Sequence, residues 1–277
     1  MSNLPPGETD RIAAAVLAAS AERRQMAAFS TDLPGFDLEA AYAVTAALRR
    51  ARVARGERTV GRKIGFTNRT IWPEYGVYAP IWGDMYDTTL RDLAATDGTL
   101  DLSPLLEPRI EPEIAFGFRT APQAGMSEAM ILGCAEWIAH GFEIVQSAFP
   151  GWQFQAPDTV AFYALHGAYR LGPRHKFTPQ NRADWLAKLR SFEIELSKDG
   201  VVMDRGQALN VLDGPLSTIS HLLNVLAKDK TNPPLRAGEI ITTGTVTRAF
   251  PVAPGETWTT KVVGLPLDGI SLRFTGS

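Results

Sequence analysis

The segment 109–118, RIEPEIAFGF, carries two glutamates two residues apart in a stretch that is otherwise mainly apolar. Side chains alternate between the two faces of a β-strand, so Glu111 and Glu113 share one face and lie about 7 Å apart. Ala115 and Gly117 continue that face with little side-chain volume, which leaves open space beside the carboxylates. The opposite face is made of Ile, Pro and Phe, as a core face would be. The segment therefore combines a core strand with two groups that can do chemistry.

Two carboxylates in a poorly solvated site repel each other, and a cation between them offsets that repulsion. Ligands with only oxygen atoms favour a hard divalent ion, Mg²⁺ or Mn²⁺. Glu143, near the start of the apolar segment FEIVQS, is the candidate for a third carboxylate ligand. The alternative is a solvated strand face, which is common in antiparallel sheets. Glu193 and Glu195 have the same spacing beside a tight turn, and we interpret that pair as exposed.

A lysine with unusual neighbours lies in the segment VGRKIGF, which reads as another strand. Lys63 shares its face with Gly61 and Gly65, and glycines there leave room for a ligand to approach. The ammonium group could neutralise a substrate carboxylate or enolate. From these residues alone, a surface lysine on a strand is the simpler interpretation.

The composition excludes several classes of protein. The chain has 277 residues and a net charge of −2, without the basic character of a nucleic-acid-binding domain. Cys134 is the only cysteine, which excludes an intramolecular disulfide and a thiolate metal cluster. A single cysteine favours a reducing compartment, the cytoplasm. The N-terminal segment lacks the pattern of a secretory signal, so we do not expect secretion. No apolar run approaches the ~18 residues that a membrane span needs.

The elements that must position these residues change along the chain from helices to strands. Helical periodicity begins at a Thr9-Asp10 cap, and a second helix runs from about Asp37 to Gly56. Many short strands follow, so we expect an α+β protein with a mixed or largely antiparallel sheet rolled into a barrel. Pro112 cannot donate to a β-ladder, which predicts a sheet edge or a break there. Three further elements are predicted: helices over 127–141 and 214–229, and a hairpin with a type I′ turn at Asp199-Gly200.

Several segments, in order along nearly the whole chain, match a known pattern. The chain resembles the 2-keto-4-pentenoate hydratase and 4-oxalocrotonate decarboxylase family, which is part of the fumarylacetoacetate hydrolase superfamily. The spacing of Glu-x-Glu and the distant third Glu is the specific part of this resemblance. The matching segments are VGRKIGF, PRIEPEIAF, EWIAHGFEIVQS, DTVA, AGEIITTGT and a closing pair of strands with a Pro-Gly turn.

The resemblance implies a mixed β-roll core over 59–277, with a helical region over 1–58 packed on it, and a homo-oligomer. It implies one Mg²⁺ or Mn²⁺ ion and small 2-oxo or 2-hydroxydienoic acids from aromatic degradation as substrates. In such a site, the substrate carboxylate and its 2-oxo oxygen bind the metal. The implied metal ligands are Glu111, Glu113 and Glu143, the active-site lysine is Lys63, and the substrate-binding residues are Gln155, Thr243, Gly244 and Thr245.

The chain departs from the family pattern at positions that handle protons and water. Ile81 stands where the family has an acidic residue, and Asp84, three residues later, is the candidate to replace it. A family serine is replaced by Leu165, and a family arginine by Ala148. His166 follows this altered stretch and is a candidate acid or base, with a packed or surface histidine as the alternative.

The altered positions make the expected pocket more apolar and aromatic. Metal-dependent enolate chemistry on a 2-oxo acid is the general prediction, and a lyase of the hydratase type is the specific one. Decarboxylation, tautomerisation and C–C hydrolysis use the same enolate and stay open. A member of the family that binds a 2-oxo acid without catalysis is an alternative from another class. The altered positions are Trp82, Phe162, Tyr163 and Leu165.

Overall fold

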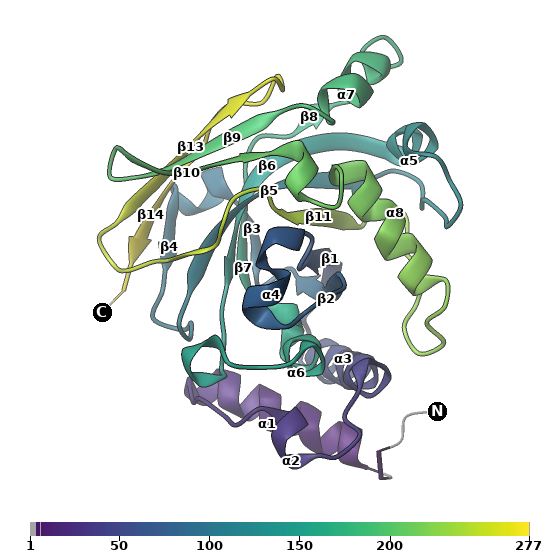
Figure 1. The fold of residues 1–277 in the computed structure, drawn as a ribbon, viewed down its shortest axis with the longest axis vertical. Coiled ribbons are helices and arrows are strands. Elements are labelled where there is room, and N and C mark those ends of the chain that lie inside the picture. The colour runs from purple at the N-terminus through teal and green to yellow at the C-terminus, as the bar shows by residue number, and fades with distance from the viewer. Residues whose placement is uncertain (1–3, 6, 277) are drawn as a thin grey trace.

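The computed structural model describes residues 4, 5 and 7–276, which form two β-sheets with helices at one end and along one side (Figure 1). The helices are α1 Glu8–Glu22, α2 Phe29–Asp32, α3 Leu38–Ala54, α4 Trp72–Tyr75, α5 Glu128–Cys134, α6 Ala156–Ala161, α7 Arg182–Lys188 and α8 Pro215–Leu226. The 3₁₀ helices are η1 Arg69–Ile71, η2 Leu93–Thr96, η3 Pro150–Trp152, η4 Tyr163–Leu165 and η5 Ala208–Asn210.

The strands begin at Thr59, after the first three helices, and continue to Thr275 with short helices between them. They are β1 Thr59–Gly65, β2 Ile81–Tyr86, β3 Leu90–Asp92, β4 Thr99–Asp101, β5 Arg109–Phe118, β6 Ala135–Val145, β7 His166–Leu171, β8 His175–Lys176, β9 Glu193–Lys198, β10 Val201–Gln207, β11 Ile240–Thr245, β12 Phe250–Pro251, β13 Thr257–Val263 and β14 Ser271–Thr275.

The larger sheet has the strand order β2-β1-β11-β5-β6-β7-β3, with β12 added beside β5 and β8 beside β6. The smaller sheet has the order β10-β9-β13-β14-β4. Parallel pairs occur in both sheets, β1 with β11 and β3 with β7 in the larger one and β14 with β4 in the smaller, among mostly antiparallel pairs. The larger sheet curls into a half-barrel (Figure 1), so the prediction of an α+β protein with a mixed, rolled sheet is confirmed.

The prediction that Pro112 marks a sheet edge is wrong, because β5 lies in the middle of the larger sheet. The alternative, a break in the ladder, is confirmed. The pairing of β11 with β5 is irregular between Thr242 and Thr245, opposite this part of β5. The Val246 amide donates to the Pro112 carbonyl at 3.4 Å, so Pro112 turns its donor-free nitrogen toward that irregular ladder. A central strand thus tolerates a proline where its partner bulges.

The predicted helix over 127–141 is only half correct. Ser127 caps α5 as expected by accepting from the Met130 amide, but the helix ends at Cys134 and β6 begins at once. Gly141 therefore lies inside a strand and does not end a helix. The prediction failed because the segment from Ala135 fits a two-residue alternation as well as a helical period. Pairing with β5 and β7 makes it a strand.

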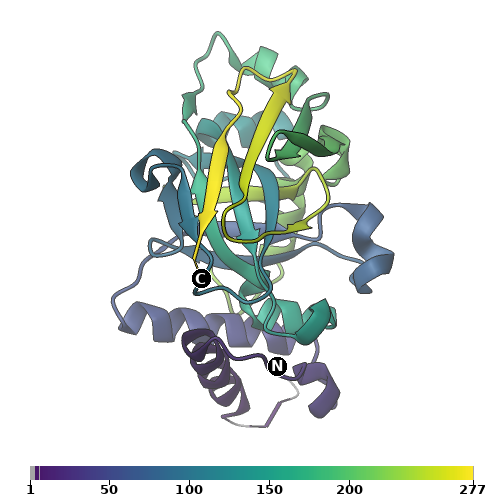
Figure 2. The same ribbon diagram turned by 90° about the vertical axis from the view of Figure 1, so that its left-hand side faces the viewer.

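The N-terminal helices form a layer below the sheets in both views (Figure 1, Figure 2). Asp37 caps α3 by accepting from the Ala40 amide, as the sequence predicts, whereas α1 begins after Gly7 without a side-chain cap at Thr9. These helices share one apolar cluster with α6 and the chain around Ile81, so they pack on the core. The division at residue 58 stays a prediction.

The hairpin and the helix over 214–229 that the sequence predicts are both present. The hairpin of β9 and β10 turns at Asp199 and Gly200, with φ values of 49° and 82°, as a type I′ turn requires. Helix α8 covers the larger sheet beside α5 (Figure 1). In the described part of the chain, 4–5 and 7–276, no helix is both long and apolar enough to cross a membrane.

Candidate metal centre

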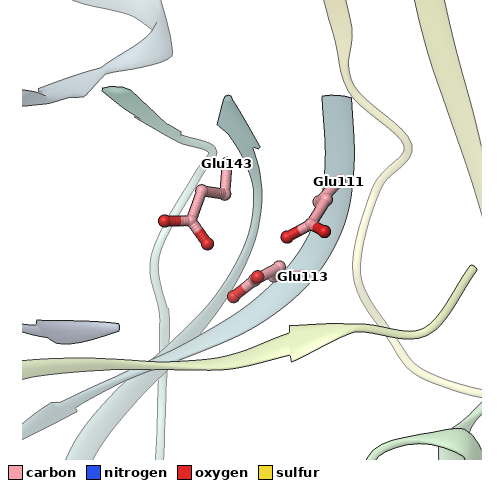
Figure 3. A group of neighbouring side chains, drawn as sticks. All are labelled: Glu111, Glu113 and Glu143. Carbon is pink, nitrogen blue, oxygen red and sulfur yellow. The ribbon is translucent and has the colours of Figure 1, made fainter. Parts of the chain in front are cut away.

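The three predicted metal ligands converge from two neighbouring strands of the larger sheet. Glu111 on β5 pairs directly with Glu143 on β6, and Glu113 follows two residues further along β5 on the same face. Figure 3 shows the three carboxylates pointing toward one another. One oxygen atom from each lies within 4.8 Å of the others. The alternative of a solvated strand face is therefore wrong, because Glu113 and Glu143 are 0% exposed.

Burial and mutual repulsion perturb the three carboxylates in different ways. Burial raises the pKa of Glu111 to about 7, against the opposing effect of Lys63. Burial and the charges of Glu143 and Glu111 raise the pKa of Glu113 well above its usual range. Burial also acts to raise the pKa of Glu143, but Lys63 and His166 outweigh it and hold that pKa below its ordinary value. The positive charge near Glu111 and Glu113 is thus too small to offset burial and repulsion and to keep both groups ionised as in water.

The chemistry of this donor set fits a divalent cation. The Gly244 amide donates to Oε2 of Glu113 at 3.0 Å, but Oε1 has no hydrogen-bond partner among the described residues. A buried, unpaired carboxylate oxygen is costly unless an ion or another donor occupies the space beside it. If all three carboxylates are ionised, Lys63 balances one of their charges, and a doubly charged ion would balance the other two. Oxygen ligands of this kind suit a hard cation.

Lys63 lies at the same centre and is not a surface lysine. Its side chain is buried, and its Nζ lies 3.2 Å from Oε2 of Glu143 and donates to the Ala164 carbonyl at 3.0 Å. Burial lowers the pKa of Lys63, but the three carboxylates more than compensate and raise it. Gly65 leaves the space the sequence predicts, since a Cβ there would lie 3.1 Å from Nζ.

His166 is brought to the same centre from the start of β7. Its Nδ1 lies 2.8 Å from Oε1 of Glu143, and its Nε2 lies 2.8 Å from the hydroxyl of Thr89. Glu143 only accepts, so we assign the ring proton to Nδ1 and let Nε2 accept from Thr89. Burial lowers the pKa of His166, although Glu143 opposes it. The histidine therefore orients a predicted metal ligand.

Asp84 is the predicted site residue that the structure places elsewhere. It pairs with Arg62 across β1 and β2, whereas Lys63 pairs with Gly83, so Asp84 and Lys63 lie on opposite faces of the sheet. Its carboxylate binds Arg49 at 2.8 Å. Alternation along β2 forbids the rearrangement that Asp84 would need to replace the family's acidic residue, and a catalytic role for it is not supported by this geometry.

The four predicted substrate-binding residues divide into two groups. Gln155 is exposed at the N-terminus of α6 and is not among the residues that line the cavity beside Glu111. Thr243, Gly244 and Thr245 lie at the bulge of β11 and are buried against β5. Gly244 reaches the centre through its backbone amide on Glu113, and its φ of 84° needs glycine. The bulge therefore supports a metal ligand in this structure.

A cavity of about 330 Å³ connects the centre with the surface. Lys63 and Glu111 form its inner end, and aromatic and aliphatic side chains form much of its wall. Arg109 joins Glu111 on the same strand face, and its guanidinium lies 4.1 Å from the centroid of the Trp152 ring. The cavity is lined by Lys63, Gly65, Phe66, Ile71, Glu74, Arg109, Glu111, Val145, Trp152, Ala164, Leu165, Arg248, Ala249, Phe250 and Pro251.

Tyr169 on β7 is a site residue that the sequence analysis misses. It pairs with Glu143 across the strands, is 0% exposed, and its hydroxyl has no partner among the described residues. That hydroxyl would lie 2.5 Å from a Cβ at Gly141, the cross-strand partner of Glu113. Burial, followed by the charges of Glu113 and Glu143, raises the pKa of Tyr169, which keeps the hydroxyl a donor. A glycine inside a strand signals such a close approach, once the strand is recognised.

The fold as a whole matches solved structures of fumarylacetoacetate hydrolase type. No protein-family model matches the chain. The fumarylpyruvate hydrolase from Pseudomonas aeruginosa, solved with Mn²⁺ and pyruvate, has a TM-score of 0.50 and 15% identity over 79% of this chain and 90% of that one, a likeness of fold alone.

More similar proteins define the family. The 2-hydroxyhexa-2,4-dienoate hydratase of Comamonas testosteroni is 31% identical over 91% of this chain and 92% of its own. The 2-keto-4-pentenoate hydratase 1 of Dechloromonas aromatica is 30% identical over 96% and 97%. The 4-oxalocrotonate decarboxylase of Pseudomonas putida G7, solved with magnesium and adipate, is 28% identical with a TM-score of 0.86, over 99% of this chain and all of that one. The chain belongs to the 2-keto-4-pentenoate hydratase and 4-oxalocrotonate decarboxylase family, whose members named here are lyases.

Proposed function

We propose that this chain is a hydratase that adds water to a small 2-hydroxy-2,4-dienoic acid. In that reaction one water is consumed, a hydroxyl group is added at C4, hydrogens are added at C3 and C5, and the C2 enol becomes a ketone. The observation that carries the proposal is the cluster of three carboxylates, two of them fully buried, beside Lys63 at the inner end of a cavity that fits a small acid. The hydratases to which the chain is similar support the same reaction.

Glu111, Glu113 and Glu143 would hold a divalent cation, which we propose is Mg²⁺ or Mn²⁺ because every ligand atom is a hard carboxylate oxygen. When bound, the cation supplies a Lewis acid for the 2-oxo acid end of the substrate. Lys63 places a buried positive charge next to the ligands, where it can balance a substrate carboxylate. Its Nζ also holds a proton at the inner end of the cavity.

His166 acts on Glu143 and not directly on the cavity, because both of its ring nitrogens are engaged. We assign it the role of positioning residue. Apolar side chains that line the cavity would exclude water from its inner end. Two of them, Val145 and Leu165, are buried. A cytoplasmic location, a homo-oligomer and a place in aromatic catabolism complete the proposal.

Decarboxylation of a 2-oxo diacid is the second candidate. The specific observation in its favour is the TM-score of 0.86 with a 4-oxalocrotonate decarboxylase over 99% of this chain. Both reactions use the same inner end of the cavity. They differ in the far end of the substrate, where a diacid carries a second carboxylate.

The proposal is tested by replacing one metal ligand. Glu113→Gln removes a charge from the centre, so we expect Mg²⁺ and Mn²⁺ affinity, measured by titration calorimetry, to fall by more than about 100-fold, beyond the effect of a residue that only supports a ligand. Turnover of 2-hydroxypenta-2,4-dienoate, followed by its ultraviolet absorbance, is expected to be lost as well.

Glu193→Gln is the matched control, since it makes the same change at an exposed glutamate on β9. The prediction that both members of this Glu-x-Glu pair are exposed holds for Glu193 only, because Glu195 is half-buried and paired with Arg205. It is expected to leave both measurements unchanged. Equal metal affinity for Glu113→Gln and the unmodified protein would contradict the metal centre. Intact metal binding by the unmodified protein without turnover of any dienoate would contradict the hydratase.

A further inference from the structure

The wall of the cavity next to the metal centre is apolar at the place where the far end of a substrate would lie. Val145, Trp152 and Leu165 form one buried cluster, and the partly buried Phe66 packs against it. All four side chains line the cavity whose inner end holds Lys63. A molecule bound with its acid end at the carboxylates therefore extends along hydrocarbon surface.

Leu165 is fixed in this wall by an unusual stretch of backbone. Tyr163, Ala164 and Leu165 in η4 have φ values of 56°, 52° and 64°, in the left-handed region that disfavours residues with side chains. Such strain persists only where the surroundings enforce it. The Lys63 ammonium donates to the Ala164 carbonyl. On the other side, Gly83 makes room, since a Cβ there would lie 2.5 Å from the Tyr163 carbonyl oxygen.

A further hydrogen bond completes this restraint. The Gln146 amide donates to the Leu165 carbonyl at 2.8 Å, which ties η4 to the end of β6. Leu165 itself is 4% exposed. The backbone that carries Leu165 is thus held on both sides, by Lys63 at Ala164 and by Gln146 at Leu165, so the apolar wall is a built part of the cavity.

The cationic groups that line the cavity have partners already. Lys63 is paired with Glu143, Arg109 lies over the Trp152 ring, and Arg248 lies 3.6 Å from Glu74 on the exposed side. A second carboxylate of a substrate placed against Val145 and Leu165 would lose its hydration without a dedicated donor there, which is costly. An uncharged hydrocarbon group in the same place is stabilised by burial.

We propose that the substrate is a 2-hydroxy-2,4-dienoate with an uncharged alkyl or aryl substituent at C5, and that Leu165 is a specificity-determining residue for this substituent. The inference rests on the proposed function and adds the chemistry of the far end. Size supports it, because a cavity of about 330 Å³ is at the lower end of those that enclose drug-sized ligands and exceeds what a five-carbon acid needs.

The test compares kcat/KM of the Mg²⁺-loaded enzyme for three dienoates: unsubstituted 2-hydroxypenta-2,4-dienoate, its 5-alkyl or 5-phenyl derivatives, and 2-hydroxyhexa-2,4-dienedioate, a diacid. We expect the substituted compounds to be preferred over the other two. In Leu165→Ser the preference for the substituted over the unsubstituted compound is expected to fall about tenfold or more, as removal of contacts in an apolar specificity pocket does. Leu165→Ala, which introduces no hydroxyl, is expected to shift the ratio in the same direction.

Leu209→Ser is the control, because Leu209 is 52% exposed on η5 and does not line the cavity. Mg²⁺ affinity of each variant is measured in parallel, and it is expected to stay within about twofold of the unmodified protein. Equal kcat/KM for the unsubstituted and the 5-alkyl or 5-phenyl dienoates, an unchanged ratio in both Leu165 variants, or preference for the diacid would overturn the inference while the hydratase stands. Failure to hydrate any dienoate despite intact Mg²⁺ binding would overturn the proposed function and this inference with it.

Discussion

Glu143 is the residue on which the charges of the site meet. It touches Lys63 through one carboxylate oxygen and His166 through the other. These two contacts hold its pKa down against burial, while Glu111 and Glu113 are left with raised pKa values. One predicted ligand is thus kept ionised by the protein itself, and the other two would need a bound cation for their charge balance.

A prediction at the residue scale concerns His166. Residues that orient a metal ligand typically contribute 10- to 100-fold to metal affinity. We expect His166→Ala to weaken Mn²⁺ binding, measured by titration calorimetry, by about that factor, because Glu143 loses its hydrogen-bond donor. His166→Asn, whose amide can occupy the place of Nδ1, is expected to retain more affinity than His166→Ala.

His221→Asn is the control for this series, since His221 is exposed on α8. It should bind Mn²⁺ like the unmodified protein. Full affinity in His166→Ala would mean that Glu143 needs no support, and the assignment of a positioning role would be wrong.

At the scale of elements, the site depends on one strand that approaches its neighbour closely. Gly141 on β6 has no side chain, and the ring of Tyr169 from β7 occupies the space beside it. A Cβ at this position would lie 2.4 Å from a ring carbon of Tyr169. Gly141 pairs with Glu113 on β5, and Tyr169 pairs with Glu143 on β6, so the contact joins the partners of two predicted metal ligands. The glycine therefore allows the Tyr169 side chain of β7 to lie close to the candidate metal centre.

This close approach gives a stability prediction. Gly141→Ala is expected to lower the free energy of unfolding by about 1–3 kcal/mol, because overpacking a filled core forces the ring or the backbone to shift. The measurement is chemical denaturation. In the Tyr169→Ala background the added cost of Gly141→Ala should largely disappear, which ties the effect to the ring.

Gly133→Ala is the matched control for this substitution. Gly133 lies in α5, and a Cβ there meets nothing within 4 Å. This alanine should be neutral or stabilising by up to about 1 kcal/mol, as in an ordinary helix. An equal loss from Gly141→Ala in both Tyr169 backgrounds would show that the contact with the ring is not the cause.

At the scale of the whole molecule, the site lies on one face of the larger sheet, across neighbouring strands. Lys63, Thr242, Ala115 and Ala139 follow one another across four strands, which leaves the floor beside the carboxylates small. His140 connects this sheet to the smaller one. Its Nδ1 lies 2.9 Å from the Glu113 carbonyl and its Nε2 2.8 Å from the Thr260 hydroxyl. The two sheets are thus joined directly behind a predicted metal ligand.

This junction predicts a pH dependence of stability. Burial lowers the pKa of His140 to about 4, from an ordinary value of 6.5. The unfolded chain therefore binds a proton at His140 between these values and the folded chain does not, so stability present above pH 6.5 is lost as the pH falls toward 4. The full difference corresponds to about 3 kcal/mol. We expect the stability of His140→Gln to lack the part of the pH dependence that His140 causes.

The measurement is urea denaturation at pH 7.5 and pH 5 in the presence of a chelator, with and without the substitution. Glu111 acts with the opposite sign, because its raised pKa of about 7 lets the folded chain take up a proton as the pH falls. The comparison between variants isolates His140. A stability difference between the two proteins that is the same at both pH values would contradict the prediction.

The sequence allowed the prediction of the ligand set, but not of its supports. Glu111 and Glu113 were recognisable because their alternation along a strand needs no tertiary information. Thr89 and Tyr169 were not, since each reaches the centre only through strand pairings between segments far apart in the chain. The error over 127–141 has the same origin, because helical and strand periodicity both fit that segment and pairing chose the strand.

Of the four positions at which the family resemblance implied a more apolar pocket, only Leu165 lines the cavity, whereas Trp82, Phe162 and Tyr163 pack in core clusters. Residue types by themselves indicated an oxygen-only candidate ligand set and a lysine between glycines. These properties follow from residue types and a two-residue period, which are fixed before folding. Only the tertiary structure decided that Asp84 faces away from the site and that His166 holds Glu143. The reason is that strand register sets which face a side chain occupies and which distant residue lies opposite, and register is a property of the assembled sheet.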